Sequence, residues 1–291
     1  SIALVCLHTS PGTEPGTGDA GGMNVVVREQ AIALGALGHR VEILTRRSDP
    51  DQPDLVELAP RVTLRALTAG PAHPLPKGEH EQWMSAFEDA LRTQGPWDVI
   101  HSHHWFSGIA ALPIARERGI PHLQSFHSIA AGRDTPLSQG ERAESPGRLA
   151  GEEYLALNSD GVITVSRAEA LTTEQRLGGD PARIAIVRPG VDAECFSPAP
   201  AGAASSTEFV VAARLHPLKG IGLAVEAVAG VPSSLNARLV IAGEGSAEVP
   251  NYRAELESEA TRLGIGDRLR FVGALTRAEL AMNCARSSDQ Q

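Results

Sequence analysis

Short apolar runs alternate with longer amphipathic stretches along most of the chain. The apolar runs have the length of β-strands, and the stretches between them place apolar residues at helical spacing. This alternation is typical of repeated βα units, in which helices cover both faces of a mainly parallel sheet. The pattern therefore predicts an α/β protein.

Seven strands and five helices are predicted up to residue 190. The strands are Ile2–Leu7, Arg40–Thr45, Val62–Leu67, Val99–Ser102, His122–Phe126, Gly161–Val165 and Ile184–Val187. The helices are Met23–Leu37, Glu79–Gln94, Phe106–Arg118, Ser145–Asn158 and Ala168–Leu177. Gly38 and Gly119 follow two of these helices, as expected where a helix ends in a left-handed residue.

A change in composition marks a domain boundary. Residues 188–207 are rich in Pro, Gly, Ala and Ser, which is typical of a connector. We therefore expect an N-terminal Rossmann-like domain over residues 1–190, a linker over 191–207 and a partial second Rossmann-like domain over 208–291. Its expected elements are Phe209–Ala213, Ile221–Ala229, Leu239–Ala242, Tyr252–Leu263, Leu269–Val272 and a last helix opened by Thr276 and Glu279 as a capping box. Three strands are fewer than the five or six of a complete doubly wound domain, so this domain is expected to be incomplete.

Composition and charge exclude several classes of protein. The formal net charge is −9, which gives no overall basic field for a nucleic acid or an anionic membrane. The longest apolar runs are far shorter than the roughly 20 residues of a transmembrane helix. Cys6, Cys195 and Cys284 are too few and too scattered for a disulfide framework or a zinc site, so a reducing cytoplasm is the expected location.

The segment Gly16-Thr-Gly18-Asp-Ala-Gly21 matches the dinucleotide-binding pattern G-x-G-x-x-G. Arg46 and Arg47 after the second predicted strand would then form a 2′-phosphate clamp for NADP. However, the pattern requires a tight turn directly after the first strand, and eight residues separate Leu7 from Gly16. An NADP oxidoreductase is therefore the weakest hypothesis. A glycine-rich loop running into a helix still offers backbone N–H groups to a phosphate or sugar, or serves only as a turn.

Several longer motifs resemble the retaining GT-B glycosyltransferases of family GT4, and in particular the branch that glycosylates inositol phosphates for mycothiol biosynthesis. These motifs are His8–Pro11, Pro15–Asn24, His101–Trp105, His127–Ser128, Pro189–Asp192, Phe196–Pro198 and Ala213–Gly220. The resemblance covers nearly the whole chain. It implies two Rossmann-like domains facing a cleft, a UDP-sugar donor and the transfer of N-acetylglucosamine. It also implies a reaction that needs no metal or other cofactor.

On the donor side, the resemblance assigns catalytic roles to Arg214 and Lys219 and places His127 beside the transferred sugar. Preorganised cations stabilise the charge that grows on a departing diphosphate. Gly22 is similar to a family glycine that approaches the diphosphate, and Gly243 is expected to border the base. The alternative for Arg214 and Lys219 is a pair of solvated surface charges.

On the acceptor side, the resemblance implies that Lys77, Ser128 and Arg148 hold the phosphate of an inositol phosphate, with Met23 and Asn24 near its ring. Cations together with a hydroxyl donor suit a phosphate. His104 stands where the family has a tyrosine, and Ser128 stands for a threonine. The shorter reach of histidine leaves the acceptor open between an inositol phosphate and another sugar phosphate or a lipid-linked inositol.

The ten histidines also suggest a metal site, and His101 and His103 should point to the same side of a strand end. No Cys, Asp or Glu joins them at ligand spacing, so a metal-free site is expected. Trp83, Trp97 and Trp105 are expected to pack in the core.

The donor half of the family carries a pair of glutamates after the point where this sequence ends. The chain is therefore expected to be either a fragment of a longer enzyme or a natural truncation, and the alternative function is a non-catalytic binding remnant. An unfinished sheet would expose an edge strand, so a homodimer is a further expectation.

Overall fold

The computed structural model describes residues 1–13, 21–132, 134–136, 144–197, 207–245 and 249–287. Contacts divide these residues into two compact units. The first holds nearly all described residues up to Gly190, and the second holds those from Val191 onward.

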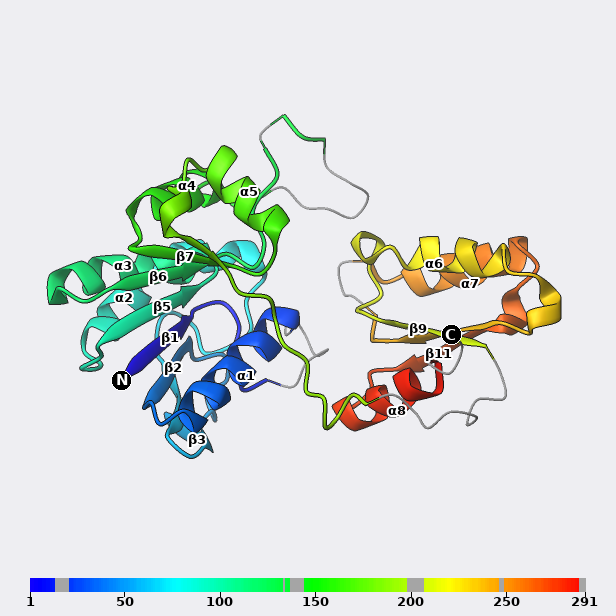
Figure 1. The fold of residues 1–291 in the computed structure, drawn as a ribbon, viewed down its shortest axis with the longest axis horizontal. Coiled ribbons are helices and arrows are strands. Elements are labelled where there is room, and N and C mark those ends of the chain that lie inside the picture. The colour runs from blue at the N-terminus through cyan, green and yellow to red at the C-terminus, as the bar shows by residue number, and fades with distance from the viewer. Residues whose placement is uncertain (14–20, 133, 137–143, 198–206, 246–248, 288–291) are drawn as a thin grey trace. The chain divides into compact units, whose positions relative to one another are not determined.

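An eight-stranded sheet forms the centre of the first unit (Figure 1), with the strand order β3-β4-β2-β1-β5-β6-β7-β8. The strands are β1 (Ile2–Cys6), β2 (Val41–Arg46), β3 (Leu55–Ala59), β4 (Val62–Leu67), β5 (Val99–His103), β6 (His122–Ser125), β7 (Gly161–Thr164) and β8 (Ile184–Ile186). β3 is antiparallel to β4, and the other neighbouring pairs are parallel. The predicted α/β class and all seven predicted strands are confirmed, with ends that shift by at most one residue.

The sequence pattern missed one strand of this unit, and it merged two helical elements into one. The sequence pattern missed β3, a five-residue edge strand with only partly buried side chains and an exposed Leu55. The predicted helix Glu79–Gln94 is two elements, the 3-10 helix η1 (Lys77–Trp83) and the helix α2 (Met84–Arg92). The 3-10 helix runs directly into the α-helix. The two types of helix have similar periods, so the spacing of apolar residues did not separate them.

Helices cover both faces of this sheet, as the alternating side chains of β1 show. Leu4 and Cys6 pack in one cluster with Val27 and Ala31 of α1 (Gly22–Ala36). The alternate residues of β1 pack in a second cluster with α2, α3 (Trp105–Arg118) and α4 (Arg148–Asn158). Because both faces are covered, β1 is an almost continuous apolar run. The remaining helical elements of this unit are α5 (Arg167–Gln175) and η2 (Pro181–Arg183).

The order of the strands creates a switch point beside β1. β2 lies on one side of β1, whereas β5 lies on the other side. In open α/β sheets, the loops after two such strands diverge and leave a ligand-binding crevice at their carboxyl ends. The loop after β1 and the residues His103 and His104 are therefore placed where this fold binds ligands.

The second unit contains a parallel three-stranded sheet with the order β11-β10-β9. Its strands are β9 (Glu208–Ala212), β10 (Arg238–Ala242) and β11 (Leu269–Gly273). Helices α6 (Ile221–Ala229) and α7 (Tyr252–Arg262) lie on one face, and α8 (Arg277–Ser287) lies on the other (Figure 1). Short 3-10 helices complete the unit, namely η3 (Pro217–Lys219), η4 (Ser233–Leu235) and η5 (Gly266–Arg268).

The elements predicted for the second unit are confirmed. Its last helix begins with the predicted capping box, since Thr276 N donates to Glu279 Oε2 at 2.8 Å and Glu279 N donates to Thr276 Oγ1 at 3.3 Å. Each bond satisfies a backbone N–H group that the first turn of a helix leaves without an intrahelical partner.

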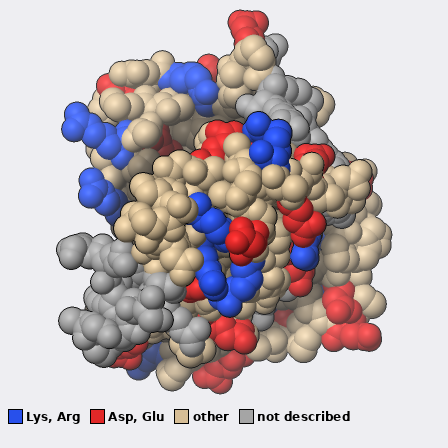
Figure 2. Space-filling model, turned by 90° about the vertical axis from the view of Figure 1, so that its right-hand side faces the viewer, with Lys and Arg blue, Asp and Glu red and all other residues tan. Residues whose placement is uncertain are grey.

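The surface carries mixed charge. On the face shown in Figure 2, cationic and anionic side chains are interspersed rather than separated by sign. Among the helices of the described residues, none is long and apolar enough to span a bilayer.

Candidate active site

Arg148 is the centre of a buried polar cluster at the start of α4. Its Nε donates to Glu152 Oε1 at 2.8 Å, and its Nη1 donates to Glu144 Oε2 at 2.7 Å. Its Nη2 donates to the backbone oxygen of Ser128 at 2.9 Å and to the Ser128 hydroxyl at 3.1 Å. The structure thus brings together two of the three residues that the sequence assigned to an acceptor phosphate.

Two glycines, Gly147 and Gly151, allow the start of α4 to pack closely against Glu81 and Trp105. A Cβ atom on Gly151 would lie 2.6 Å from the ring of Trp105, and one on Gly147 would lie 2.3 Å from Glu81 Oε1. The backbone N–H of Gly147 also donates to Glu81 Oε1 at 3.0 Å, which ties the start of α4 to η1. The buried Trp105 ring therefore fixes the position of α4, and with it the position of Arg148. Trp97 and Trp105 are core residues, as expected.

Glu152 is a member of this cluster that the sequence analysis missed. Its carboxylate is buried and also accepts the backbone N–H of Ala130 at 3.0 Å. Burial raises the pKa of Glu152, while the neighbouring Arg148 opposes that shift. Glu144, Arg148 and Glu152 follow one another at intervals of four residues, which is the spacing of ion pairs along a helix. That spacing is a signal from which the cluster could have been predicted.

The carboxyl ends of β5 and β6 carry a second buried group, composed of histidines. His103 Nδ1 lies 2.8 Å from His127 Nε2, and His101 Nε2 lies 2.9 Å from Ser125 Oγ. The rings of His101 and His103 are 4.2 Å apart, so these residues do point to the same side, as predicted. Burial lowers the pKa of His101 to about 3 and that of His127 to about 4. All three rings are therefore uncharged at neutral pH, since burial also holds the pKa of His103 well below its usual value.

His104 and His127 both have left-handed backbone conformations, with φ of 68° and 60°. Such angles are uncommon for residues other than glycine, and they cluster at ligand-binding and catalytic sites. His104 directly follows β5, and His127 lies two residues after the end of β6, at the carboxyl edge of the sheet. This strain is independent support for a functional role there.

His104 lies in a cluster of rings rather than on an open surface. It is 2% exposed, and its ring centroid lies 4.4 Å from that of His8 and 4.8 Å from that of Phe106. His80 packs on the same cluster, and burial together with the nearby Arg46 lowers its pKa to about 4. Within the described ranges, no group of three or more His, Cys, Asp or Glu side chains is arranged to hold a metal ion.

Asn24 connects the loop after β1 to the start of α1. Its Nδ2 donates to Thr9 Oγ1 at 2.9 Å and to the backbone oxygen of Ser10 at 2.6 Å, and its Oδ1 accepts from Gly21 N at 3.3 Å. Because Asn24 is only 2% exposed, its contact with an acceptor ring stays a prediction.

The other residues assigned to this side are less fully described. Gly22 is the first residue of α1, and among the described residues no atom outside its chain neighbours and the backbone of α1 lies within 4 Å of the place a Cβ would take. Met23 is partly buried and packs on the cluster under α1. Lys77 begins η1, but its side chain lies outside the described part of the structure, as do Gly16 and Gly18.

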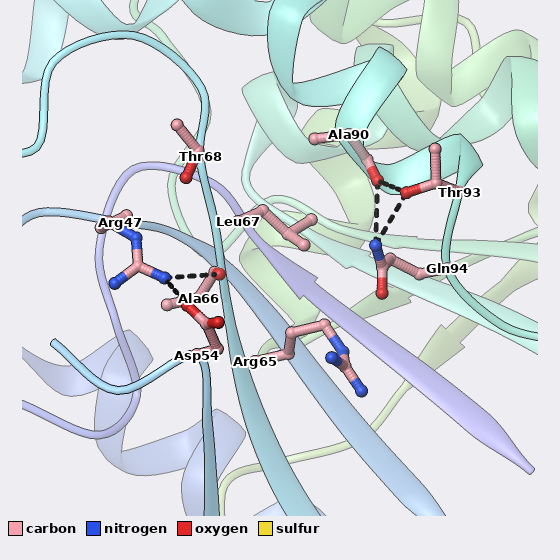
Figure 3. A pocket seen from close by; sticks show the side chains of 9 residues that line it. All are labelled: Arg47, Asp54, Arg65, Ala66, Leu67, Thr68, Ala90, Thr93 and Gln94. Atoms are coloured by element: carbon pink, nitrogen blue, oxygen red, sulfur yellow. Dashed lines mark hydrogen bonds and ion pairs between the residues drawn. The ribbon is translucent and has the colours of Figure 1, made fainter.

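Arg46 and Arg47, the alternative NADP clamp, are both used within the chain. Arg46 donates to the backbone oxygens of Pro71 and His73. Arg47 pairs with Asp54 and donates to the backbone oxygen of Ala66, in the pocket shown in Figure 3. In addition, β1 ends at Cys6 and α1 begins only at Gly22, so no tight turn joins them. The structure agrees with rejecting the dinucleotide-binding hypothesis.

In the second unit, Arg214 and Lys219 both lie in the segment between β9 and the N-terminus of α6. Arg214 follows β9, and Lys219 ends η3 immediately before Gly220, the N-cap of α6. Gly220 has φ of 67°, and the side chain of His216 accepts the backbone N–H of Leu218 at 3.2 Å. A cation next to the positive end of a helix forms a favourable environment for a phosphate group, and Lys219 has this position.

Gly243 holds the loop that carries Arg214. Its φ is 152°, and a Cβ atom there would lie 1.9 Å from the backbone oxygen of Ala213. This close approach lets Ala213 N donate to Ala242 O at 2.9 Å and Leu215 N donate to Glu244 O at 2.8 Å. The geometry therefore gives Gly243 a structural role beside Arg214, and its contact with a base stays a prediction.

Both units of the chain match families of known proteins. Residues 21–190 match the family described as Glycosyl transferase 4-like domain, and residues 200–289 match Glycosyl transferases group 1. The chain is 38% identical to D-inositol 3-phosphate glycosyltransferase of Kribbella flavida and 36% identical to that of Streptosporangium roseum. Each alignment covers 96% of this chain, with 70% of the Kribbella protein and 69% of the Streptosporangium protein.

Solved structures give the same fold. Sucrose-phosphate synthase from Thermosynechococcus elongatus superposes with a TM-score of 0.81 at 25% identity, over 98% of this chain and 73% of that one. HepE from Anabaena, solved in complex with UDP, gives 0.66 at 17% identity, over 97% of this chain and 71% of that one.

Proposed function

The chain belongs to the GT4 family of glycosyltransferases, which have the GT-B fold, and from this premise we propose that it transfers N-acetylglucosamine from UDP to an inositol phosphate with retention of configuration. The observation that carries the acceptor proposal is the contact between Arg148 and Ser128. The relatives named D-inositol 3-phosphate glycosyltransferase support the choice of inositol.

The acceptor phosphate is assigned to the side chains of Arg148, Ser128 and Lys77. A guanidinium group can give two parallel N–H bonds to a phosphate, and the hydroxyl adds a third donor. Because Glu152 binds the Nε side of Arg148 and holds it in place, the phosphate would meet the Nη side, where Glu144 now lies. Anchoring the phosphate in this way positions an inositol hydroxyl for attack.

The donor diphosphate is assigned to Arg214, Lys219 and the N-terminus of α6. As the acceptor oxygen bonds to the anomeric carbon, the bond to the diphosphate breaks and negative charge grows on UDP. Fixed cations and a helix N-terminus stabilise that charge more in the transition state than in the bound substrate. His127 is uncharged at neutral pH, so its role beside the sugar is that of a hydrogen-bonding group rather than a cation.

A different acceptor is the second candidate, and the burial of His104 in a ring cluster favours considering it. The family has a tyrosine at this position, whose hydroxyl reaches farther than the imidazole ring. Another sugar phosphate or a lipid-linked inositol would then take the place of the inositol phosphate.

A transfer assay with an acceptor panel tests these proposals. The protein is incubated with UDP-N-acetylglucosamine or UDP-glucose and with inositol 3-phosphate, inositol or glucose 6-phosphate, and the products are identified by mass spectrometry. We expect a product from UDP-N-acetylglucosamine and inositol 3-phosphate. A preference for glucose 6-phosphate would overturn the acceptor, and a preference for UDP-glucose would overturn the donor.

A further inference from the structure

The contact between His103 and His127 contains information about where the ring protons lie. His103 is 1% exposed, its Nδ1 is 2.8 Å from His127 Nε2, and its own Nε2 is buried without a hydrogen-bond partner among the described residues. His127 follows β6 in a left-handed backbone conformation, and the bond to His103 is the ring contact that holds its Nε2. Neither ring is charged at neutral pH, so each carries one proton on one of its two nitrogens.

A hydrogen bond between two neutral imidazoles contains one proton, which leaves two arrangements. If His127 donated that proton, His103 would carry its own proton on Nε2, where a buried N–H group would have no acceptor. A buried donor without a partner loses its bond to water and gains nothing in return, so this arrangement is costly. If His103 donates instead, only a lone pair stays without a partner, and buried acceptors without partners are tolerated more often than donors. The second arrangement is therefore favoured.

The neighbouring ring of His101 has its proton fixed in the same way. Gln30 Nε2 donates to His101 Nδ1 at 3.3 Å, so the proton of His101 lies on Nε2 and is donated to Ser125 Oγ at 2.9 Å. The Ser125 hydroxyl in turn donates to the backbone oxygen of Ile163 at 2.8 Å. His101 thus packs against His103 with all of its own polar atoms satisfied, and it offers no acceptor to His103 Nε2.

We infer that His103 is a positioning residue that donates its Nδ1 proton to His127 Nε2 and thereby fixes His127 as the Nδ1-protonated tautomer. His127 then presents an N–H donor, rather than a lone pair, to an oxygen atom of the transferred sugar. The inference rests on the proposed function in that it places His127 beside the sugar. The tautomer of a histidine is commonly set by the bond that its other nitrogen makes, and His103 has this role here.

The test is a nuclear magnetic resonance spectrum of the protein with ¹⁵N-labelled histidine at pH 7, which reports directly which ring nitrogen carries the proton. The His127 signals are assigned by their loss in His127→Gln. We expect the His127 proton on Nδ1 in the unsubstituted protein and its movement to Nε2, the tautomer that free imidazole side chains prefer, in His103→Phe. A proton on Nε2 in the unsubstituted protein would overturn the inference, and this result does not depend on whether the variant folds.

A matched control and a kinetic readout separate this role from a general loss of structure. His39→Phe changes an exposed histidine and should leave the His127 signals unchanged. In the transfer assay, His103→Phe should lower kcat about tenfold, the value of one lost hydrogen bond, while KM for the acceptor stays unchanged. The spectra need no substrate, so an Nε2 proton with intact transfer would refute the tautomer alone. An Nδ1 proton without any transfer would instead refute the proposed function.

Discussion

The two candidate substrate-binding regions are built in different ways. At the edge of the sheet in the first unit, Arg148, Glu152 and the histidines of β5 are buried. Arg148 binds Glu152, and His103 binds His127, which follows β6. In the second unit, Lys219 is exposed, and Arg214 lies on a loop placed by glycine geometry and backbone hydrogen bonds. Substitutions in the first region should therefore reduce stability together with binding, whereas cation substitutions in the second should reduce binding alone.

The largest expected effect is the loss of stability in Arg148→Met. This change leaves the buried carboxylate of Glu152 without its ion-pair partner, which should lower the free energy of unfolding by about 3–5 kcal/mol. Urea unfolding followed by tryptophan fluorescence reports on the first unit, because all three tryptophans precede residue 190. The control Arg183→Met removes an exposed arginine and should cost less than about 1 kcal/mol. Equal losses in the two variants would show that the buried cluster is not different in kind from a surface pair.

Gly243→Ala should have the largest effect on the second unit. The new Cβ atom would overlap the backbone oxygen of Ala213, and alanine also disfavours the φ of 152°. We expect a loss of about 2–3 kcal/mol, measured by circular dichroism during urea unfolding. Gly245→Ala is the matched control, since in the described part of the structure no atom beyond its chain neighbours lies within 4 Å of a Cβ atom there. A stable Gly243→Ala protein that binds UDP normally would refute the role of glycine geometry in this region.

Lys219→Ala should weaken UDP binding without lowering stability. One charge-assisted hydrogen bond contributes about 1.5–3 kcal/mol, so the dissociation constant should rise by about ten- to a hundredfold in calorimetric titrations. Arg262→Ala, which removes an exposed cation on α7 paired with Glu259, should leave UDP binding unchanged. A comparable loss of affinity in both variants would indicate a diffuse electrostatic effect rather than a site at α6.

Acidification should destabilise the first unit through histidines whose rings are neutral in the folded state. The folded-state pKa is lowered to about 4 for His80, His122 and His127, below an unfolded value near 6.5. Between those values the unfolded chain binds more protons, so stability is complete above about pH 6.5 and is lost as the pH falls toward 4. One such histidine gives a slope of about 1.4 kcal/mol per pH unit. Urea unfolding at pH 7, 6 and 5 measures the slope, and an unchanged midpoint would contradict the assignment of neutral buried rings.

The smallest expected effect is a gain in acceptor affinity for Glu144→Gln. Glu144 binds Arg148 Nη1 at 2.7 Å, on the side assigned to the phosphate, so its negative charge competes with the ligand. Removing the charge should tighten inositol phosphate binding by about threefold, the scale of a partly exposed ion pair. Glu153→Gln, which removes an exposed charge from α4, should have no effect in the same titration. Weaker binding in Glu144→Gln would place the phosphate elsewhere.

Much of this fold could be predicted because the strands of a parallel sheet are short apolar runs. β4 and α6 have the bounds expected from the sequence, and Gly119 ends α3 in a left-handed conformation. β3 could not be found by the same criterion, because an edge strand exposes part of its side chains. It pairs with β4 as a tight hairpin, but the turn residues Pro60 and Arg61 lack the glycine or asparagine that usually marks a two-residue hairpin turn.

The sequence could predict which residues belong to the candidate site better than it could predict their hydrogen-bond partners. The resemblance to known motifs named Ser128 and Arg148 together, and the structure places them in contact. It did not name Glu152, for which the four-residue spacing from Arg148 was a local signal, and it did not reveal His103 as the partner of His127, because that bond depends on how β5 and the loop after β6 pack. Spacing can suggest which side chains share a face, but not which of their atoms bind.

The central claim is that the first unit recognises the phosphate of its acceptor through Arg148 and Ser128. The most direct test is a calorimetric titration of the chain with inositol 3-phosphate and, separately, with inositol. We predict that the phosphorylated compound binds at least about tenfold more tightly, because charge-assisted hydrogen bonds to the phosphate are absent for inositol. Equal affinities for the two compounds would contradict the claim.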